Sequence, residues 1–136
     1  EVLSCQALYE RQPFCKESGK SGFLHMDGQA VFKFAVRKVP EAILEVLELN
    51  GLTIEDIDWF VVHQANRRII ESVARHLGVS LERFPVNLQE YGNTSAASIP
   101  ILLDEMRHSG QLKKGQRLVI AGFGAGLTWG ASILDC

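Results

Sequence analysis

Along the chain, segments whose apolar residues have the spacing of a β-strand alternate with segments that have the spacing of an α-helix. Trp59–Val62 is a run of four apolar residues, rich in aromatic and β-branched side chains, and it predicts a buried strand. Comparable runs predict further strands at residues 84–88, 117–123 and 127–134. Gly124 and Gly126 allow the backbone to turn back tightly between the last two strands.

Helical spacing precedes the first of these strands and separates the next ones. Asp27 is a suitable N-cap for a first helix, and Pro40 predicts a kink or a restart before a second helical segment that stops at Gly51. Residues 65–77 predict a helix with one apolar face. The last predicted helix is amphipathic, and its apolar face holds Ile99, Leu102, Leu103 and Met106.

The predicted elements follow the order strand, helix, strand, helix and then two strands in succession. This order predicts a layered α/β unit with a mixed sheet. Residues 1–25 show little periodicity, and Pro13 and the run at 18–22 predict loops, so we expect a loop-rich lead-in before one unit at 26–136. Because the chain opens on Glu1 rather than on methionine, we expect it to be the carboxyl-terminal part of something longer.

Composition narrows the classes of protein. The 14 Lys and Arg against 16 Asp and Glu give a net charge of -2, without the cationic surplus that binding to nucleic acid requires. No stretch approaches the roughly 20 uninterrupted apolar residues of a membrane span, so we expect a soluble intracellular protein. Three cysteines without paired spacing argue against a disulfide framework. His25 and His108 have no partner at metal-ligand spacing, so we expect no metal.

Two polar residues stand where chemistry is expected. His63 directly follows a predicted strand, and Asn93 lies in a turn before the last helix. A neutral imidazole N–H and a carboxamide N–H can stabilise a developing oxyanion without exchanging a proton. Spacing alone leaves other interpretations open, because a buried histidine can be a satisfied core residue and an asparagine before Thr94 can be a helix cap.

Three segments resemble successive signatures of β-ketoacyl-acyl-carrier-protein synthase III, the condensing enzyme that starts bacterial fatty-acid synthesis. They are His63-Gln-Ala-Asn-Arg-Arg-Ile-Ile70, Gly92-Asn-Thr-Ser-Ala-Ala-Ser98 and Phe123-Gly-Ala-Gly-Leu-Thr-Trp-Gly130. The resemblance extends from about Met26 to Leu134, in the same order and with compatible gaps. It implies a thiolase-like layered α/β fold in which this chain is the carboxyl-terminal half, with a mixed five-stranded sheet and helices on both faces.

The resemblance also implies roles for single residues. His63 and Asn93 would bind the thioester carbonyl of malonyl-acyl-carrier protein and stabilise the enolate left by decarboxylation. The backbone N–H of Ala125, where the family usually has glycine, would be part of an oxyanion hole. The residues implied along the coenzyme A arm are Gly28, Gln29, Phe32, Asn66 and Phe123, and those implied in docking the carrier protein are Arg68, Lys33 and Arg75. For Arg67 we expect instead an exposed ion pair with Glu71.

The nucleophile is the point at which the chain departs from the family. The family's reactive cysteine lies in the amino-terminal half, and none of Cys5, Cys15 and Cys136 matches it. We therefore predict that the chain is inactive alone. Joined to that half, it would condense acetyl-CoA or another short acyl-CoA with malonyl-acyl-carrier protein. The resemblance further implies a cytoplasmic homodimer and no cofactor beyond the coenzyme A thioester that serves as substrate.

Two other functions compete with this prediction. A polyketide-type or alkylquinolone-type synthase would reuse the histidine and the asparagine with a different acyl pocket. A catalytically silent module that binds acyl-carrier protein or coenzyme A would need no nucleophile. The Gly-Asn-Thr-Ser-Ala-Ala form at 92–97 and the Thr-Trp-Gly ending at 128–130 favour the fatty-acid enzyme.

Overall fold

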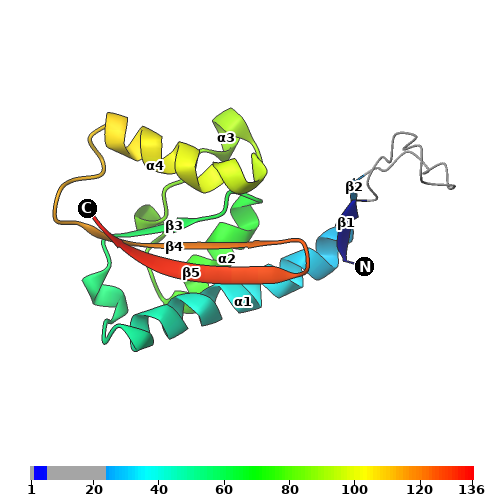
Figure 1. Cartoon of the computed structure of the whole chain (residues 1–136), viewed down its shortest axis with the longest axis horizontal. Helices are drawn as coiled ribbons and strands as arrows, with labels where there is room; N and C mark the ends of the chain where they lie inside the picture. Colours follow the sequence, from blue (N-terminus) through cyan, green and yellow to red (C-terminus); the bar gives the residue numbers. More distant parts are fainter. Residues whose placement is uncertain (1, 6–23) are drawn as a thin grey trace, which may run out of the picture.

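A computed structural model describes residues 2–5 and 24–136 (Figure 1). Two short strands, β1 (Leu3–Cys5) and β2 (Leu24–Met26), pair antiparallel beside the start of the first helix. No strand was predicted in this stretch, and these two add to the loop-rich lead-in expected from the sequence. The loops predicted around Pro13 and at 18–22 lie outside the described residues.

The main sheet has the strand order β3-β4-β5. Its strands are β3 (Trp59–Val62), β4 (Arg117–Gly124) and β5 (Thr128–Asp135). β3 runs parallel to β4, and β4 runs antiparallel to β5, so the prediction of a mixed sheet is confirmed. Within the described residues this sheet has three strands rather than the five expected from the resemblance.

The prediction of a strand at residues 84–88 is wrong. Leu81–Arg83 is a single turn of 3-10 helix, and a short helix, α3 (Leu88–Tyr91), begins at the last predicted strand residue. The Pro85 carbonyl and the Asn87 N–H are hydrogen-bonded by the side chain of Gln64 at 3.4 and 3.3 Å. Because a side chain satisfies these backbone groups, the segment needs no neighbouring strand.

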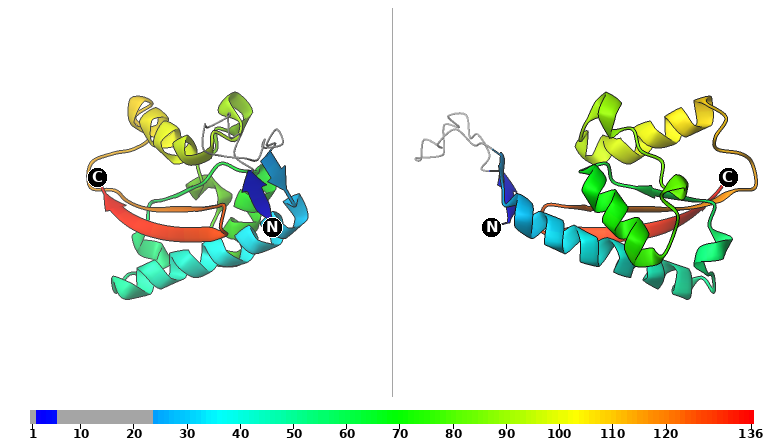
Figure 2. Two further views of the ribbon diagram at one scale, coloured as in Figure 1. Left: turned by 45° about the vertical axis from the view of Figure 1, so that its right-hand side comes forward. Right: turned by 180° about the vertical axis from the view of Figure 1, so that it is seen from behind.

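Helices cover both faces of the sheet, as expected from the resemblance (Figures 1 and 2). α1 (Gly28–Leu49) and α2 (Arg67–Leu77) pack on one face, where Phe60 and Val62 are buried. α4 (Ser98–His108) packs on the other face, against Val61. Since successive strand residues point to opposite faces, β3 supplies both cores. None of the helices in the described part of the chain combines the length and the apolar character that crossing a bilayer requires.

The first helix is continuous, so of the kink or restart predicted at Pro40 the restart does not occur. Asp27 is the N-cap, as predicted, and its carboxylate accepts from the N–H groups of Gln29 and Ala30 at 3.1 and 3.0 Å. A proline inside a helix removes one backbone hydrogen bond. The Pro40 ring is fully buried against the core, and this packing offsets the missing bond.

Neighbouring residues of α1 test this packing. Ile43 is completely buried, whereas Leu44 is 44% exposed. We expect Ile43→Ala to lower the free energy of unfolding by about 2–5 kcal/mol, because it leaves a cavity between α1 and the sheet. Leu44→Ala should lower it by less than about 1 kcal/mol. Denaturant titration of both variants measures the difference, and equal losses would contradict the packing described here.

Candidate functional site

The carboxyl ends of β3 and β4 open into a pocket of about 470 Å³. His63, Asn93, Phe123 and Ala125 all line it. These residues come from three separate stretches of the chain. Four residues singled out from the sequence therefore meet at one sheet edge, where open α/β sheets place their chemistry.

His63 reaches the pocket because it continues the alternation of β3. Its backbone N–H donates to the Ala121 carbonyl at 2.9 Å and so extends the pairing with β4 by one residue. Its side chain therefore lies on the same face as Val61, where α4 begins. There the imidazole Nδ1 lies 2.7 Å from the Ser98 hydroxyl oxygen, and the ring meets the Phe123 ring edge to face at 5.3 Å.

Burial in this position lowers the pKa of the His63 imidazole from its usual 6.5. The cause is desolvation, which penalises the charged ring. The ring is therefore neutral at neutral pH and carries one N–H. A neutral donor can hold a developing negative charge without giving up its proton.

Asn93 is oriented by the turn that precedes α4. Gly92 has φ 65° and ψ -155°, a backbone conformation that glycine adopts without strain. The Asn93 Oδ1 accepts a hydrogen bond from the backbone N–H of Ser95 at 3.0 Å. The bond closes a local turn and is not the helix cap considered as an alternative, because the N-caps of the two following helices are Thr94 and Ala97. It leaves the Nδ2 group without a hydrogen-bond partner among the described residues, so the turn and donation to a ligand are compatible.

The other residues implied along a coenzyme A arm lie beside the pocket rather than in its lining, apart from Phe123. Gly28, Gln29 and Phe32 belong to the first turns of α1. Asn66 is the N-cap of α2 and accepts from the Arg68 N–H at 2.9 Å. The Arg68 guanidinium lies over the Phe32 ring, 5.7 Å from its centroid, so the starts of both helices adjoin.

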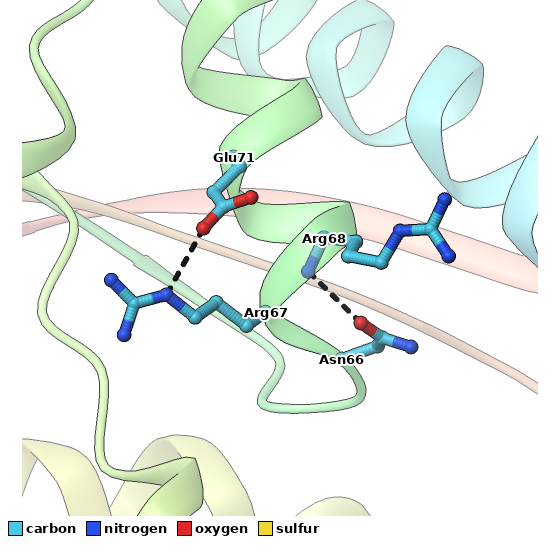
Figure 3. A network of polar contacts seen from close by, with 4 residues as sticks. All are labelled: Asn66, Arg67, Arg68 and Glu71. Carbon is cyan, nitrogen blue, oxygen red and sulfur yellow. Dashed lines mark hydrogen bonds and ion pairs between the residues drawn. The ribbon is translucent and has the colours of Figure 1, made fainter.

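The two arginines at the start of α2 leave the helix on different sides (Figure 3). Arg67 pairs with Glu71 at 3.0 Å on an exposed surface, so the expected i, i+4 ion pair is confirmed. Arg68 extends toward α1 instead. Lys33 and Arg75 are exposed, and neither lines the pocket.

The turn between β4 and β5 accommodates Ala125 without strain. Ser95 is the single non-glycine residue with a positive φ among those described, so Ala125 does not need the conformation that glycine supplies. The Ala125 backbone lies outside both strands, and its N–H makes no hydrogen bond to the described residues. No cysteine of the described part of the chain lines the pocket, and Cys136 is exposed.

Two polar residues of the site were missed from the sequence. Ser98 is buried and bonded to His63, and Gln64 is completely buried beside it. The Gln64 amide donates to the carbonyls of Val62 and Pro85 at 2.8 and 3.4 Å and accepts from the Asn87 N–H. Both residues stand in signature segments quoted from the sequence, at 63–70 and 92–98, but no spacing rule distinguishes a buried polar residue there from an exposed one.

Solved structures show which class of protein has this fold. The crystal structure of 3-oxoacyl-(acyl carrier protein) synthase III from Pseudomonas aeruginosa PAO1 has a TM-score of 0.88 at 38% identity, over 99% of this chain and 39% of that chain. The enzyme from Thermus thermophilus gives a TM-score of 0.87 at 46% identity, over 99% and 41%. The chain therefore has the thiolase-like fold of condensing enzymes.

The family follows from the sequence comparisons. The model described as 3-oxoacyl-[acyl-carrier-protein (ACP)] synthase III C terminal matches residues 47–136, and the chain belongs to this family. The β-ketoacyl-[acyl-carrier-protein] synthase III of Clostridium acetobutylicum is 50% identical over 135 residues, which are 98% of this chain and 42% of that protein. The chain thus spans about two fifths of the length of such relatives.

The backbone at Gly92 gives a test of how the Asn93 turn is held. We expect Gly92→Ala to lower the free energy of unfolding by about 1–3 kcal/mol, because alanine is strained at this φ and ψ. The reason is conformational, since no atom lies within 4 Å of the added Cβ. Gly130→Ala is the matched control, with equal space but no positive φ, and should change the free energy by less than about 1 kcal/mol. Equal effects in denaturant titrations would contradict this explanation.

The half-buried imidazole of His63 gives a pH-dependent contribution to stability. Its folded pKa lies below the unfolded value of 6.5, so the unfolded chain binds more protons at acidic pH. Stability is therefore full above pH 6.5 and falls as the pH drops through 6.5 toward the folded pKa. We expect His63→Gln to flatten this part of the curve. Unfolding free energies measured from about pH 8 to about pH 5 test it, and an unchanged slope would contradict it.

Proposed function

We propose that this chain is the carboxyl-terminal half of a β-ketoacyl-acyl-carrier-protein synthase III, with His63 and Asn93 as its decarboxylation pair. One observation supports the proposal above all others. Both side chains line one pocket, and each is fixed by the protein through one atom, Nδ1 of His63 and Oδ1 of Asn93. The remaining nitrogens, Nε2 and Nδ2, have no partner among the described residues and are available as donors.

In the proposed first step these donors bind the thioester carbonyl oxygen of malonyl-acyl-carrier protein. The bond between the carboxylate and the methylene carbon breaks, and carbon dioxide leaves. The electron pair of the broken bond stays with the methylene carbon and forms the enolate. The two N–H groups stabilise the negative oxygen of this enolate. No proton is transferred, which suits a histidine that burial keeps neutral.

In the proposed second step the enolate carbon attacks an acyl group carried as a thioester on a cysteine of the amino-terminal half. A carbon–carbon bond forms and the carbonyl oxygen becomes a tetrahedral oxyanion, which the backbone N–H of Ala125 can stabilise. Collapse of this intermediate expels the cysteine thiolate and yields 3-oxoacyl-acyl-carrier protein. The acyl group would come from acetyl-CoA or another short acyl-CoA, with release of coenzyme A.

The partners and the domain boundary belong to the same proposal. Residues 26–136 would be the half-domain, joined to an amino-terminal half with the nucleophile and paired in a cytoplasmic homodimer. Gly28, Gln29, Phe32, Asn66 and Phe123 would follow the coenzyme A arm. Arg68, Lys33 and Arg75 would meet the acidic carrier protein, where exposed cations mainly set the rate and orientation of encounter. The adjoining starts of α1 and α2, with Phe32 under the Arg68 guanidinium, support a shared binding surface.

Two half-reactions measured separately test the pair. In the protein that contains both halves, we expect His63→Ala or Asn93→Ala to slow malonyl decarboxylation by about 10²–10³-fold, the usual effect of removing one oxyanion donor. Acylation of the cysteine from labelled acyl-CoA should be unchanged. Release of labelled carbon dioxide and transfer of the acyl label to protein provide the two readouts.

The matched controls replace the same residue types away from the pocket. His108 is exposed on α4, and Asn50 caps the end of α1 through the Val46 carbonyl. His108→Ala and Asn50→Ala should leave both half-reactions unchanged. Normal decarboxylation in His63→Ala or Asn93→Ala would remove the proposed roles. Binding of acyl-carrier protein without either half-reaction in the unmodified protein would favour the silent binding module instead.

A further inference from the structure

The hydroxyl of Ser98 has two neighbours in a closed environment. Ser98 is only 2% exposed at the first residue of α4. Its Oγ lies 2.7 Å from the His63 Nδ1 and accepts a hydrogen bond from the backbone N–H of Gln64 at 3.3 Å. A hydroxyl offers one proton and two acceptor positions. One acceptor position is therefore taken by the Gln64 N–H. The open question is whether Ser98 donates its proton to His63 or accepts a second hydrogen bond from it.

Counting protons settles that direction. If the His63 Nδ1 carried the proton, Ser98 would accept twice and its own O–H would have no partner among the described residues. Buried polar hydrogens rarely stay unpaired, because each one loses its hydrogen bonds to water. If Ser98 donates to an unprotonated Nδ1, both the hydroxyl and Nδ1 are satisfied. In a neutral ring the single proton then resides on Nε2.

We propose that Ser98 is a positioning residue that holds the neutral His63 in the tautomer with its proton on Nε2, the nitrogen left free for the substrate. This inference rests on the proposed function, because the Nε2 proton matters only if it is donated to the thioester oxygen. The opposite tautomer would present a lone pair to that oxygen and would repel the enolate. Ser98 therefore acts on the substrate through His63.

The experiment is a double-mutant cycle between residues 63 and 98 in the protein that contains both halves. We expect Ser98→Ala to slow malonyl decarboxylation by about 10- to 100-fold, as is common when the partner that orients a histidine is removed. Cysteine acylation should be unchanged. In a His63→Ala background the same change should have no further effect on decarboxylation, because Ser98 then has no imidazole to orient.

Ser109→Ala is the matched control at the other end of α4. Its hydroxyl donates to the Met106 carbonyl at 3.2 Å, away from the pocket, and its removal should leave both half-reactions unchanged. An unaltered decarboxylation rate in Ser98→Ala would overturn the inference. So would an equal further loss in the His63→Ala background, or a parallel loss of both half-reactions with a lower melting temperature, which would indicate a purely structural role.

A measurement on the unmodified protein does not depend on how the variants fold. The two ring nitrogens of a neutral histidine have different ¹⁵N chemical shifts according to which one is protonated. We expect the His63 resonances, assigned by their absence in His63→Ala, to show protonated Nε2 and unprotonated Nδ1. The reverse would overturn the role of Ser98. Decarboxylation that survives in His63→Ala would instead overturn the proposed function, so the two failures are distinct.

Discussion

The buried side-chain amide of Gln64 is the constraint on which the site depends. It is completely inaccessible, and its hydrogen bonds join the end of β3 to the backbone at Pro85 and Asn87. Asn87 in turn donates to Glu105 of α4 at 2.5 Å. These contacts join β3, the segment that leads toward Asn93, and α4. The relative position of the imidazole and the carboxamide is therefore fixed by a residue that is neither of them.

The sequence predicted the elements that are built on a regular period. β3, α2 and both strands of the terminal hairpin lie within about two residues of their predicted bounds, because each has an apolar face that repeats every two or every 3.6 residues. The prediction of a strand at 84–88 was wrong because the side chain of Gln64, distant in sequence, satisfies the hydrogen bonds of this backbone. The helix restart considered at Pro40 does not occur, because burial of the proline ring is a tertiary effect that local propensity does not include.

The location of the site was predictable, and its internal contacts were not. His63 and Asn93 stand at the carboxyl side of the sheet, so their approach follows from topology. The roles assigned to them came from resemblance to a known family. The hydrogen bond between Ser98 and the His63 Nδ1 could not be predicted from the spacing of the two residues in the sequence, since it depends on how the start of α4 packs over β3. The same holds for Arg68 over Phe32, which requires two helix starts to adjoin.

The two donors differ in what orients them, and this has an evolutionary consequence. Asn93 is held by a main-chain N–H at position 95, so this contact makes no demand on the side chain there, and the residue is restricted only by its φ of 55°. His63 is held by a hydroxyl, which few side chains can replace. A side-chain substitution at position 98 would therefore disturb the orientation of the imidazole, whereas one at position 95 would leave the bond to the carboxamide in place. Divergence among descendants of such a site should be more constrained at position 98 than at position 95.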